Sequence, residues 1–70
     1  MYLPRLRDLR EDRDMKQKEI GALLGIDQRV YSTYETGKRE MPLDMLVTLA
    51  DFYGVTMDYL VGRTDKKHGK

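Results

Sequence analysis

A polar stretch near the middle of the chain carries the side chains best suited to recognising another molecule by hydrogen bonds. Its members are Gln28, Arg29, Ser32, Thr33 and Thr36, which share one face if the stretch is helical. Glutamine can bond in bidentate fashion to adenine, arginine can do so to guanine, and a threonine methyl can meet the methyl of thymine. A solvated helix face is the ordinary explanation of such a stretch, so residue type alone leaves both interpretations open.

Few residues of the chain are suited to catalysis. The chain has no cysteine, His68 is its one histidine, and no base is placed near Ser32 in the pattern. The acids between residues 8 and 14 alternate with arginines at helical spacing, which is typical of exposed ion pairs and not of a metal loop. We therefore expect no enzyme, no cofactor and no metal site.

Turn-forming residues divide the chain into short pieces, and no piece has the alternation of a β-strand. The pattern predicts helices over residues 4–12, 17–24, 28–36, 42–53 and 57–61. Pro4 and Pro42 are expected at the first helical position, and Asp27 and Thr56 as N-caps. A glycine follows each of the last four helices, where a left-handed residue is expected. The fold class is therefore expected to be all-α.

Apolar residues at helical spacing predict the buried face of each helix. They are Leu3, Leu6 and Leu9 for the first helix, Ile20, Leu23 and Leu24 for the second, Tyr31 and Tyr34 for the third, Leu43, Leu46, Leu49, Ala50 and Tyr53 for the fourth, and Tyr59, Leu60 and Val61 for the fifth. A chain of 70 residues has room for one core only. We expect one domain over residues 1–63 and a flexible basic tail over residues 64–70.

Charge is unevenly distributed although the net charge is only +1. Residues 1–39 carry nine bases and seven acids, residues 40–62 four acids and no base, and residues 63–70 four bases and one acid. The net charge alone is too small to indicate a polyanion binder. The chain has no cysteine, no signal-peptide pattern and no long apolar run, which together predict a cytoplasmic protein without a membrane partner.

The second and third expected helices are joined by a short turn that begins at Gly25, and small residues stand nearby at Gly21 and Ala22. Two helices that cross through so short a turn bring their backbones close together, which bulky side chains would prevent. The arrangement is a helix-turn-helix, whose second helix can enter the major groove of DNA.

Three stretches of the sequence occur together in a specific pattern. They are Gln17-x-x-Ile20-Gly21-x-x-Leu24-Gly25-Ile26-Asp27-Gln28, then Tyr31-Ser32-x-Tyr34-Glu35-x-Gly37-Lys38-Arg39, then Pro42, Leu46, Ala50, Gly54-Val55 and Asp58-Tyr59-Leu60. In this pattern residues 5–62 resemble the lambda-repressor-like helix-turn-helix domains, also called the Cro/repressor or xenobiotic-response-element class. The resemblance implies a compact five-helix domain of the short stand-alone bacterial or phage type, which binds operator DNA.

The resemblance also implies roles for individual residues. Base reading falls to Gln28, Arg29, Ser32 and Thr33, phosphate binding to Lys16, Gln17, Thr36, Lys38 and Arg39, and a structural brace to Arg10 and Glu35. Lys16 departs from the family, which prefers Ser, Thr or Asn as the N-cap there, so we expect this cap to be missing. Gly21 stands where the family usually has alanine.

These features predict a sequence-specific regulator of transcription, a repressor that binds a palindromic operator in double-stranded DNA as a homodimer. Met57, Tyr59 and Val61 are candidate dimer contacts. The expected location is the cytoplasm, at the nucleoid through DNA. Five helices leave no room for a ligand-sensing domain, so we expect no small-molecule ligand unless the chain is a fragment. The alternative is a protein-interaction or antitoxin-like module on the same fold that reads little or no DNA.

Overall fold

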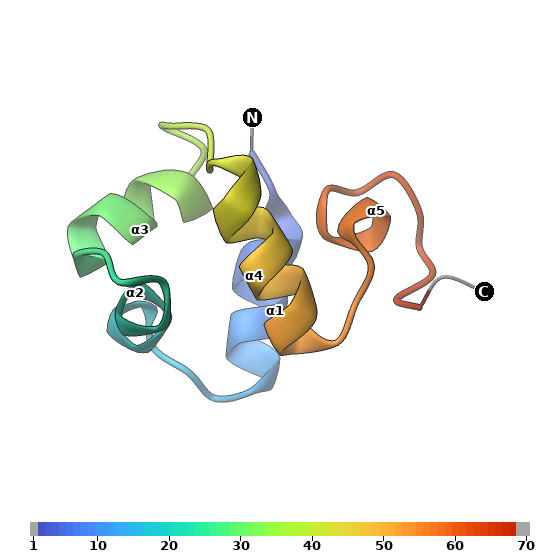
Figure 1. The fold of residues 1–70 in the computed structure, drawn as a ribbon, viewed down its shortest axis with the longest axis horizontal. Coiled ribbons are helices and arrows are strands. Elements are labelled where there is room, and N and C mark those ends of the chain that lie inside the picture. The colour runs from blue at the N-terminus through green and yellow to red at the C-terminus, as the bar shows by residue number, and fades with distance from the viewer. Residues whose placement is uncertain (1, 69–70) are drawn as a thin grey trace. The chain divides into compact units, whose positions relative to one another are not determined.

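Five α-helices make up the regular structure in the computed structural model of the chain, which describes residues 2–68 (Figure 1). They are α1 (Pro4–Asp12), α2 (Gln17–Leu24), α3 (Gln28–Glu35), α4 (Leu43–Tyr53) and α5 (Met57–Leu60). No strand occurs among these described residues, and the predicted all-α class is confirmed. Residues 69–70 of the predicted tail lie outside the described residues.

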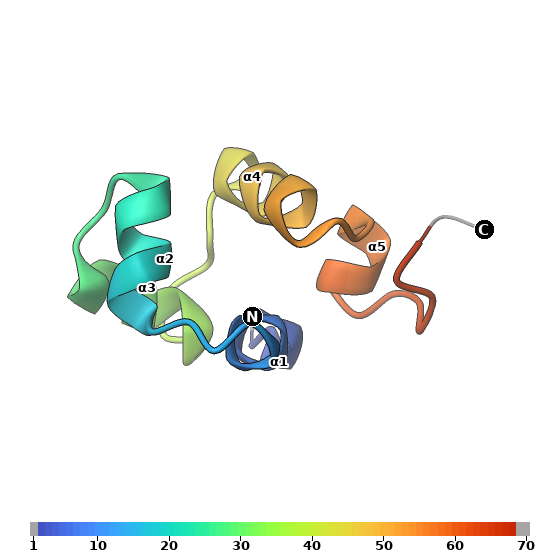
Figure 2. The ribbon, with the colours of Figure 1, turned by 90° about the horizontal axis from the view of Figure 1, so that it is seen from below.

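The chain divides into two units. Unit 1 covers residues 1–40 and holds α1, α2 and α3; unit 2 covers residues 41–70 and holds α4 and α5. Within unit 1, α3 contacts both α2 and α1, and α2 and α3 lie next to each other in both views (Figures 1 and 2). Among the described helices, none has the length and apolar character needed to cross a membrane.

The ends of the helices follow from local chemistry. Pro4 is the first residue of α1, and the Asp27 carboxylate accepts a hydrogen bond from the backbone N–H of Arg29 at 2.7 Å, as predicted for an N-cap. The hydroxyl of Thr56 likewise accepts from the backbone N–H of Tyr59 at 3.0 Å. The predicted ends of α3 and α5 are each one residue too long, because Thr36 and Val61 are C-caps.

The predicted position of Pro42 is wrong. Pro42 is the N-cap of α4 and not its first helical residue, since its ψ of 147° is extended. Its carbonyl oxygen accepts from the backbone N–H groups of Met45 and Leu46, both at 3.1 Å, as the carbonyl of an N-cap residue does. The helix therefore begins one residue later, at Leu43.

Most of the predicted core residues are buried. In unit 1 they are Leu3, Leu6, Leu9, Ile20 and Tyr31, and in unit 2 Leu49, Ala50, Tyr53 and Leu60, joined by Met41, which was not predicted. The predictions for Leu43 and Leu23 are wrong, because these side chains are 69% and 42% exposed. Both stand at the margin of their apolar stripe, where a helix turns a side chain towards solvent.

The corner between α2 and α3 depends on two glycines. Gly25 ends α2 with a φ of 72°, in the left-handed region that was predicted for it. Gly21 is buried, and a Cβ atom there would lie only 2.9 Å from the carbonyl oxygen of Ile26. Ala22 is exposed, so of the two small residues only Gly21 allows the close approach.

Part of the predicted tail lies against the start of α5. The backbone N–H of Thr56 donates to the carbonyl oxygen of Lys67 at 2.9 Å, within unit 2. The bond ties the segment after residue 63 to the residue that caps α5.

The turn after α3 packs on the start of the chain. Gly37 has a φ of 82°, and a Cβ atom there would lie 3.1 Å from both Cα and Cβ of Tyr2. Gly25 has a similar φ of 72°, but nothing lies within 4 Å of the place that its Cβ would take. The two glycines therefore share the backbone strain that a side chain would bring and differ in the steric contact.

We expect Gly37→Ala to lower the free energy of unfolding more than Gly25→Ala does. Both substitutions place a side chain in the left-handed region, which costs about 1–2 kcal/mol, but only Gly37→Ala must also displace Tyr2. Urea denaturation of the two variants measures the difference. Equal losses would show that the contact between Gly37 and Tyr2 contributes nothing.

Candidate nucleic-acid interface

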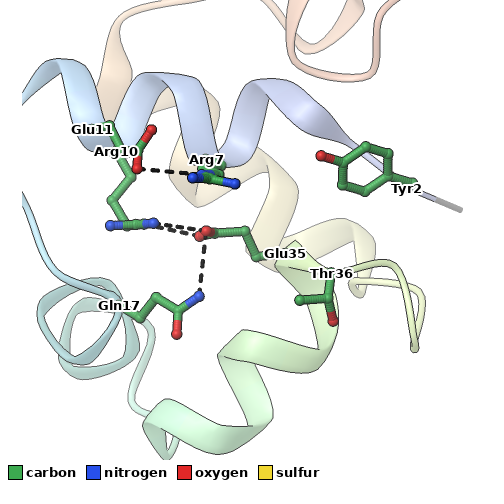
Figure 3. A pocket seen from close by; sticks show the side chains of 7 residues that line it. All are labelled: Tyr2, Arg7, Arg10, Glu11, Gln17, Glu35 and Thr36. Atoms are coloured by element: carbon green, nitrogen blue, oxygen red, sulfur yellow. Dashed lines mark hydrogen bonds and ion pairs between the residues drawn. The ribbon is translucent and has the colours of Figure 1, made fainter.

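A bidentate ion pair joins α1 to α3 (Figure 3). Arg10 donates through Nε to Oε2 of Glu35 at 3.0 Å and through Nη2 to Oε1 at 2.8 Å. The side chains of Arg10 and Glu35 are only 12% and 4% exposed. The third nitrogen of the guanidinium donates to the carbonyl oxygen of Met15 at 2.8 Å, and the Gln17 amide donates to Glu35 at 3.3 Å. One carboxylate therefore holds α1, the start of α2 and the end of α3.

The Glu35 carboxyl is ionised at neutral pH despite its burial. Burial alone raises its pKa, since the charged form loses contact with water. Hydrogen bonds from Arg10 and Gln17, with the charge of Arg10, outweigh burial and hold the pKa of Glu35 below its ordinary value. The hydrogen bond with Glu35 in turn raises the pKa of Arg10, so both partners stay charged.

The N-terminus of α2 presents unpaired backbone donors. The Lys16 side chain forms no cap, as predicted, but the sequence interpretation missed Glu19, whose carboxylate accepts from the backbone N–H of Lys16 at 3.0 Å. The signal was a glutamate three residues after the N-cap. Among residues 2–68 the backbone N–H groups of Gln17 and Lys18 have no hydrogen-bond partner. Such groups, at the positive end of the helix dipole, favour an anion.

The N-terminal end of α3 carries the exposed candidate base readers. Gln28 is exposed, and the Arg29 side chain is 96% exposed with only a long ion pair, 3.9 Å from Nε to Oδ1 of Asp27. Ser32 and Thr33 are half-buried. The structure therefore places the four predicted readers on one helix, but only the first two are exposed.

Two predicted contact residues already use their hydroxyl protons. Thr33 donates to the carbonyl oxygen of Val30 at 2.6 Å, and Thr36 donates to that of Ser32 at 2.8 Å. Thr33 can therefore offer a base its methyl group or an acceptor, and Thr36 can offer a phosphate no proton while this bond persists. Bonding of a helical threonine to the preceding turn is common enough to have been foreseen.

The turn after α3 carries two exposed cations, Lys38 and Arg39. The backbone N–H of Arg39 donates to the carbonyl oxygen of Thr33 at 3.1 Å, which fixes this turn to α3. Across residues 2–68 no group of three or more histidine, cysteine or acidic side chains is arranged to hold a metal ion.

Comparison with known proteins gives the family. The family profile described as Helix-turn-helix matches residues 6–60. The chain belongs to this helix-turn-helix family. Within the family its relatives are of the Cro/repressor class that the residue pattern predicted. The family is one of DNA-binding regulators without catalysis, which supports the expectation that the chain is not an enzyme.

Similar helix-turn-helix proteins are named as regulators. The HTH-type transcriptional regulator YobD of Bacillus subtilis is 40% identical over 93% of this chain and 58% of its own length. The cryptic phage CTXphi transcriptional repressor RstR of Vibrio cholerae is 35% identical over 93% of this chain and 59% of its own. A crystal structure of a transcriptional regulator from Listeria innocua superposes with a TM-score of 0.79, at 25% identity, over 93% of this chain and 61% of that one. The chain thus spans about three-fifths of the length of these proteins.

We expect Glu35→Gln to destabilise the helix-turn-helix unit at neutral pH by about 3–5 kcal/mol, because it leaves the buried Arg10 charge uncompensated. The control is Glu11→Gln, which removes a carboxylate that is 51% exposed and paired with Arg7. Loss of such an exposed pair changes stability by about 1 kcal/mol or less. Urea denaturation at pH 7 measures both losses.

The pH dependence of the same pair provides a second readout. Because the pKa of Glu35 is lowered by folding, its contribution is complete above the ordinary pKa of a glutamate, about 4.3, and is lost as the pH falls through the lowered value. The stability gap between the unmodified chain and Glu35→Gln should therefore narrow below that pH. A gap that stays constant down to pH 2 would contradict the assignment.

Proposed function

We propose that this chain is a sequence-specific DNA-binding regulator of transcription, a repressor that places α3 in the major groove. The observation that carries the proposal is the exposure of Gln28 and Arg29 at the start of the second helix of a helix-turn-helix. Residues at this end of a recognition helix contact base edges in such complexes. The repressor name of the relative from Vibrio cholerae supports the direction of regulation.

The readers contribute unequally in this proposal. Arg29 can bond in bidentate fashion to guanine and Gln28 to adenine, each with about 1–3 kcal/mol of discrimination against a wrong base. Thr33 contributes its methyl group to a thymine, because its hydroxyl proton is bonded to Val30. Ser32, which is half-buried, contributes a hydroxyl to the same face.

Phosphates are held on either side of α3. The unpaired backbone N–H groups of Gln17 and Lys18 receive one phosphate, with Lys16 beside them. Lys38 and Arg39, exposed in the turn after α3, receive phosphates through their charges. Thr36 takes part through its hydroxyl once the bond to Ser32 is exchanged.

A palindromic operator and a homodimer complete the proposal. Symmetric dimers are the commonest assemblies, and a two-fold dimer places two recognition helices on half-sites about one helical turn apart. Met57, Tyr59 and Val61 are half-buried, and their remaining exposed area is the proposed dimer contact in unit 2. Residues 1–63 would form the binding domain, with the basic segment after them adding non-specific attraction to DNA at the nucleoid.

Selection from a random duplex library at about 150 mM salt tests the function. A DNA-binding repressor should enrich a palindrome whose half-sites lie about 34–36 Å apart. Failure to enrich any sequence, with tight co-purification of another protein, would contradict the proposal. That result would instead favour the protein-interaction module on the same fold.

Arg29→Ala and Lys38→Ala should have different effects on the selected site. Arg29→Ala should relax the preference at one base position and cost about 1–3 kcal/mol there. Lys38→Ala should weaken binding to every sequence about equally and lower the slope of log affinity against log salt by about one unit. Fluorescence anisotropy with the selected duplex and its single-base variants measures both. Equal losses on every sequence for Arg29→Ala would exclude Arg29 as a base reader.

A further inference from the structure

A pocket of about 220 Å³ opens on unit 1 beside the ion pair between α1 and α3 (Figure 3). Gln17 and Thr36, two of the proposed phosphate contacts, line it from α2 and from the end of α3. Tyr2 and Arg7 line it from the start of the chain and from α1. Nothing in the proposed interface uses Tyr2 or Arg7, although both face the same pocket as Gln17 and Thr36.

Tyr2 is held in place by its backbone and presents its side chain at the pocket. The space that a Cβ of Gly37 would need is taken by Cα and Cβ of Tyr2, 3.1 Å away, so this backbone rests on the turn after α3. The Tyr2 side chain is largely exposed, and its hydroxyl is directed towards Arg7 (Figure 3). A phenol in this position is a hydrogen-bond donor at the rim of the pocket.

The two arginines of the pocket differ in availability. Arg10 is more strongly engaged, since each of its nitrogens Nε, Nη1 and Nη2 donates to Glu35 or to Met15. Arg7 is paired with Glu11 at 3.3 Å, and both side chains are more than half exposed. Exposed pairs of this kind contribute about 1 kcal/mol or less. Arg7 donates to Glu11 through Nε alone, so it can exchange this contact for a phosphate that accepts from two of its donors.

The charge balance of the pocket identifies the source of the phosphate. Arg7 and Arg10 are matched by Glu11 and Glu35, so the lining has no net charge. A free phosphate ion gains little from such a site. A DNA strand that is already bound at Gln17 through one phosphate can place a second phosphodiester in the pocket. This second contact costs no further loss of translational freedom, as in any multivalent contact.

We propose that this pocket receives a DNA phosphodiester on the α1 side of the one bound at Gln17, with Arg7 as its cation and the Tyr2 hydroxyl as a donor. The inference rests on the proposed function and extends the interface onto α1 and the start of the chain. Glu11 then competes with the phosphate for the Arg7 guanidinium, and Arg7 releases Glu11 when DNA binds.

Two variants that remove opposite charges from the ion pair of Arg7 and Glu11 provide the test. Arg7→Gln and Glu11→Gln both abolish the pair, so any structural effect of losing it is common to both variants. Arg7→Gln should lower affinity for the selected duplex and reduce the salt slope by about 0.9, the value for one phosphate contact. Glu11→Gln should raise affinity, because it frees Arg7. Tyr2→Phe should weaken binding by about threefold, as expected for loss of one hydrogen bond.

Arg13→Gln and Lys38→Ala are the controls. Arg13 ends the same helix, is exposed and does not line the pocket, so Arg13→Gln should leave the salt slope nearly unchanged. If Arg7→Gln behaves like Arg13→Gln while Lys38→Ala lowers the slope, the proposed phosphate site is wrong and the proposed function stands. If the unmodified chain binds no duplex, both the phosphate site and the proposed function are wrong.

A titration with inorganic phosphate, followed by NMR, tests the source of the phosphate. Millimolar phosphate should not shift the Tyr2 or Arg7 signals. Saturable shifts of these signals would contradict the assignment to a DNA phosphodiester.

Discussion

Unit 1 depends on the buried pair of Arg10 and Glu35. The carboxylate accepts from Arg10 and Gln17, and the guanidinium also reaches the Met15 carbonyl, so α1, the link to α2, α2 and α3 meet at one charge. Removing either partner leaves the other charged and buried, which is more damaging than the loss of an exposed pair. The candidate phosphate anchor at Gln17 and the end of the candidate recognition helix at Glu35 therefore cannot move independently.

Much of this arrangement could be predicted from local sequence, because caps and glycines act over a few residues. Asp27, Thr56 and Gly25 fixed their helix ends as predicted. Side chains at the margin of an apolar stripe were harder, as Leu23 and Leu43 illustrate, because exposure there depends on what packs nearby. The contact of Tyr2 with Gly37 joins residues far apart in sequence, and no local pattern predicts it.

In the candidate site, too, the sequence predicted some features and left others to the surrounding structure. Residue types and the family resemblance selected Gln28, Arg29 and Thr33, but they could not show which donors were already used. Arg29 has only a long ion pair with Asp27, whereas the hydroxyl proton of Thr33 is bonded to Val30. Specificity from α3 should thus be concentrated at its first turn, since a donor engaged within the helix cannot also discriminate between bases.

The balance of charge in the pocket also bears on the proposed binding of a polyanion by a chain with a net charge of only +1. Affinity for DNA depends on the cations that reach phosphates and not on the total. Arg7 and Glu11 sum to zero in the free protein, yet a guanidinium that turns from Glu11 to a phosphate still releases a counterion from DNA. The weak exposed pair of Arg7 and Glu11 on α1 therefore leaves Arg7 available in the proposed complex, where a phosphate competes against only about 1 kcal/mol.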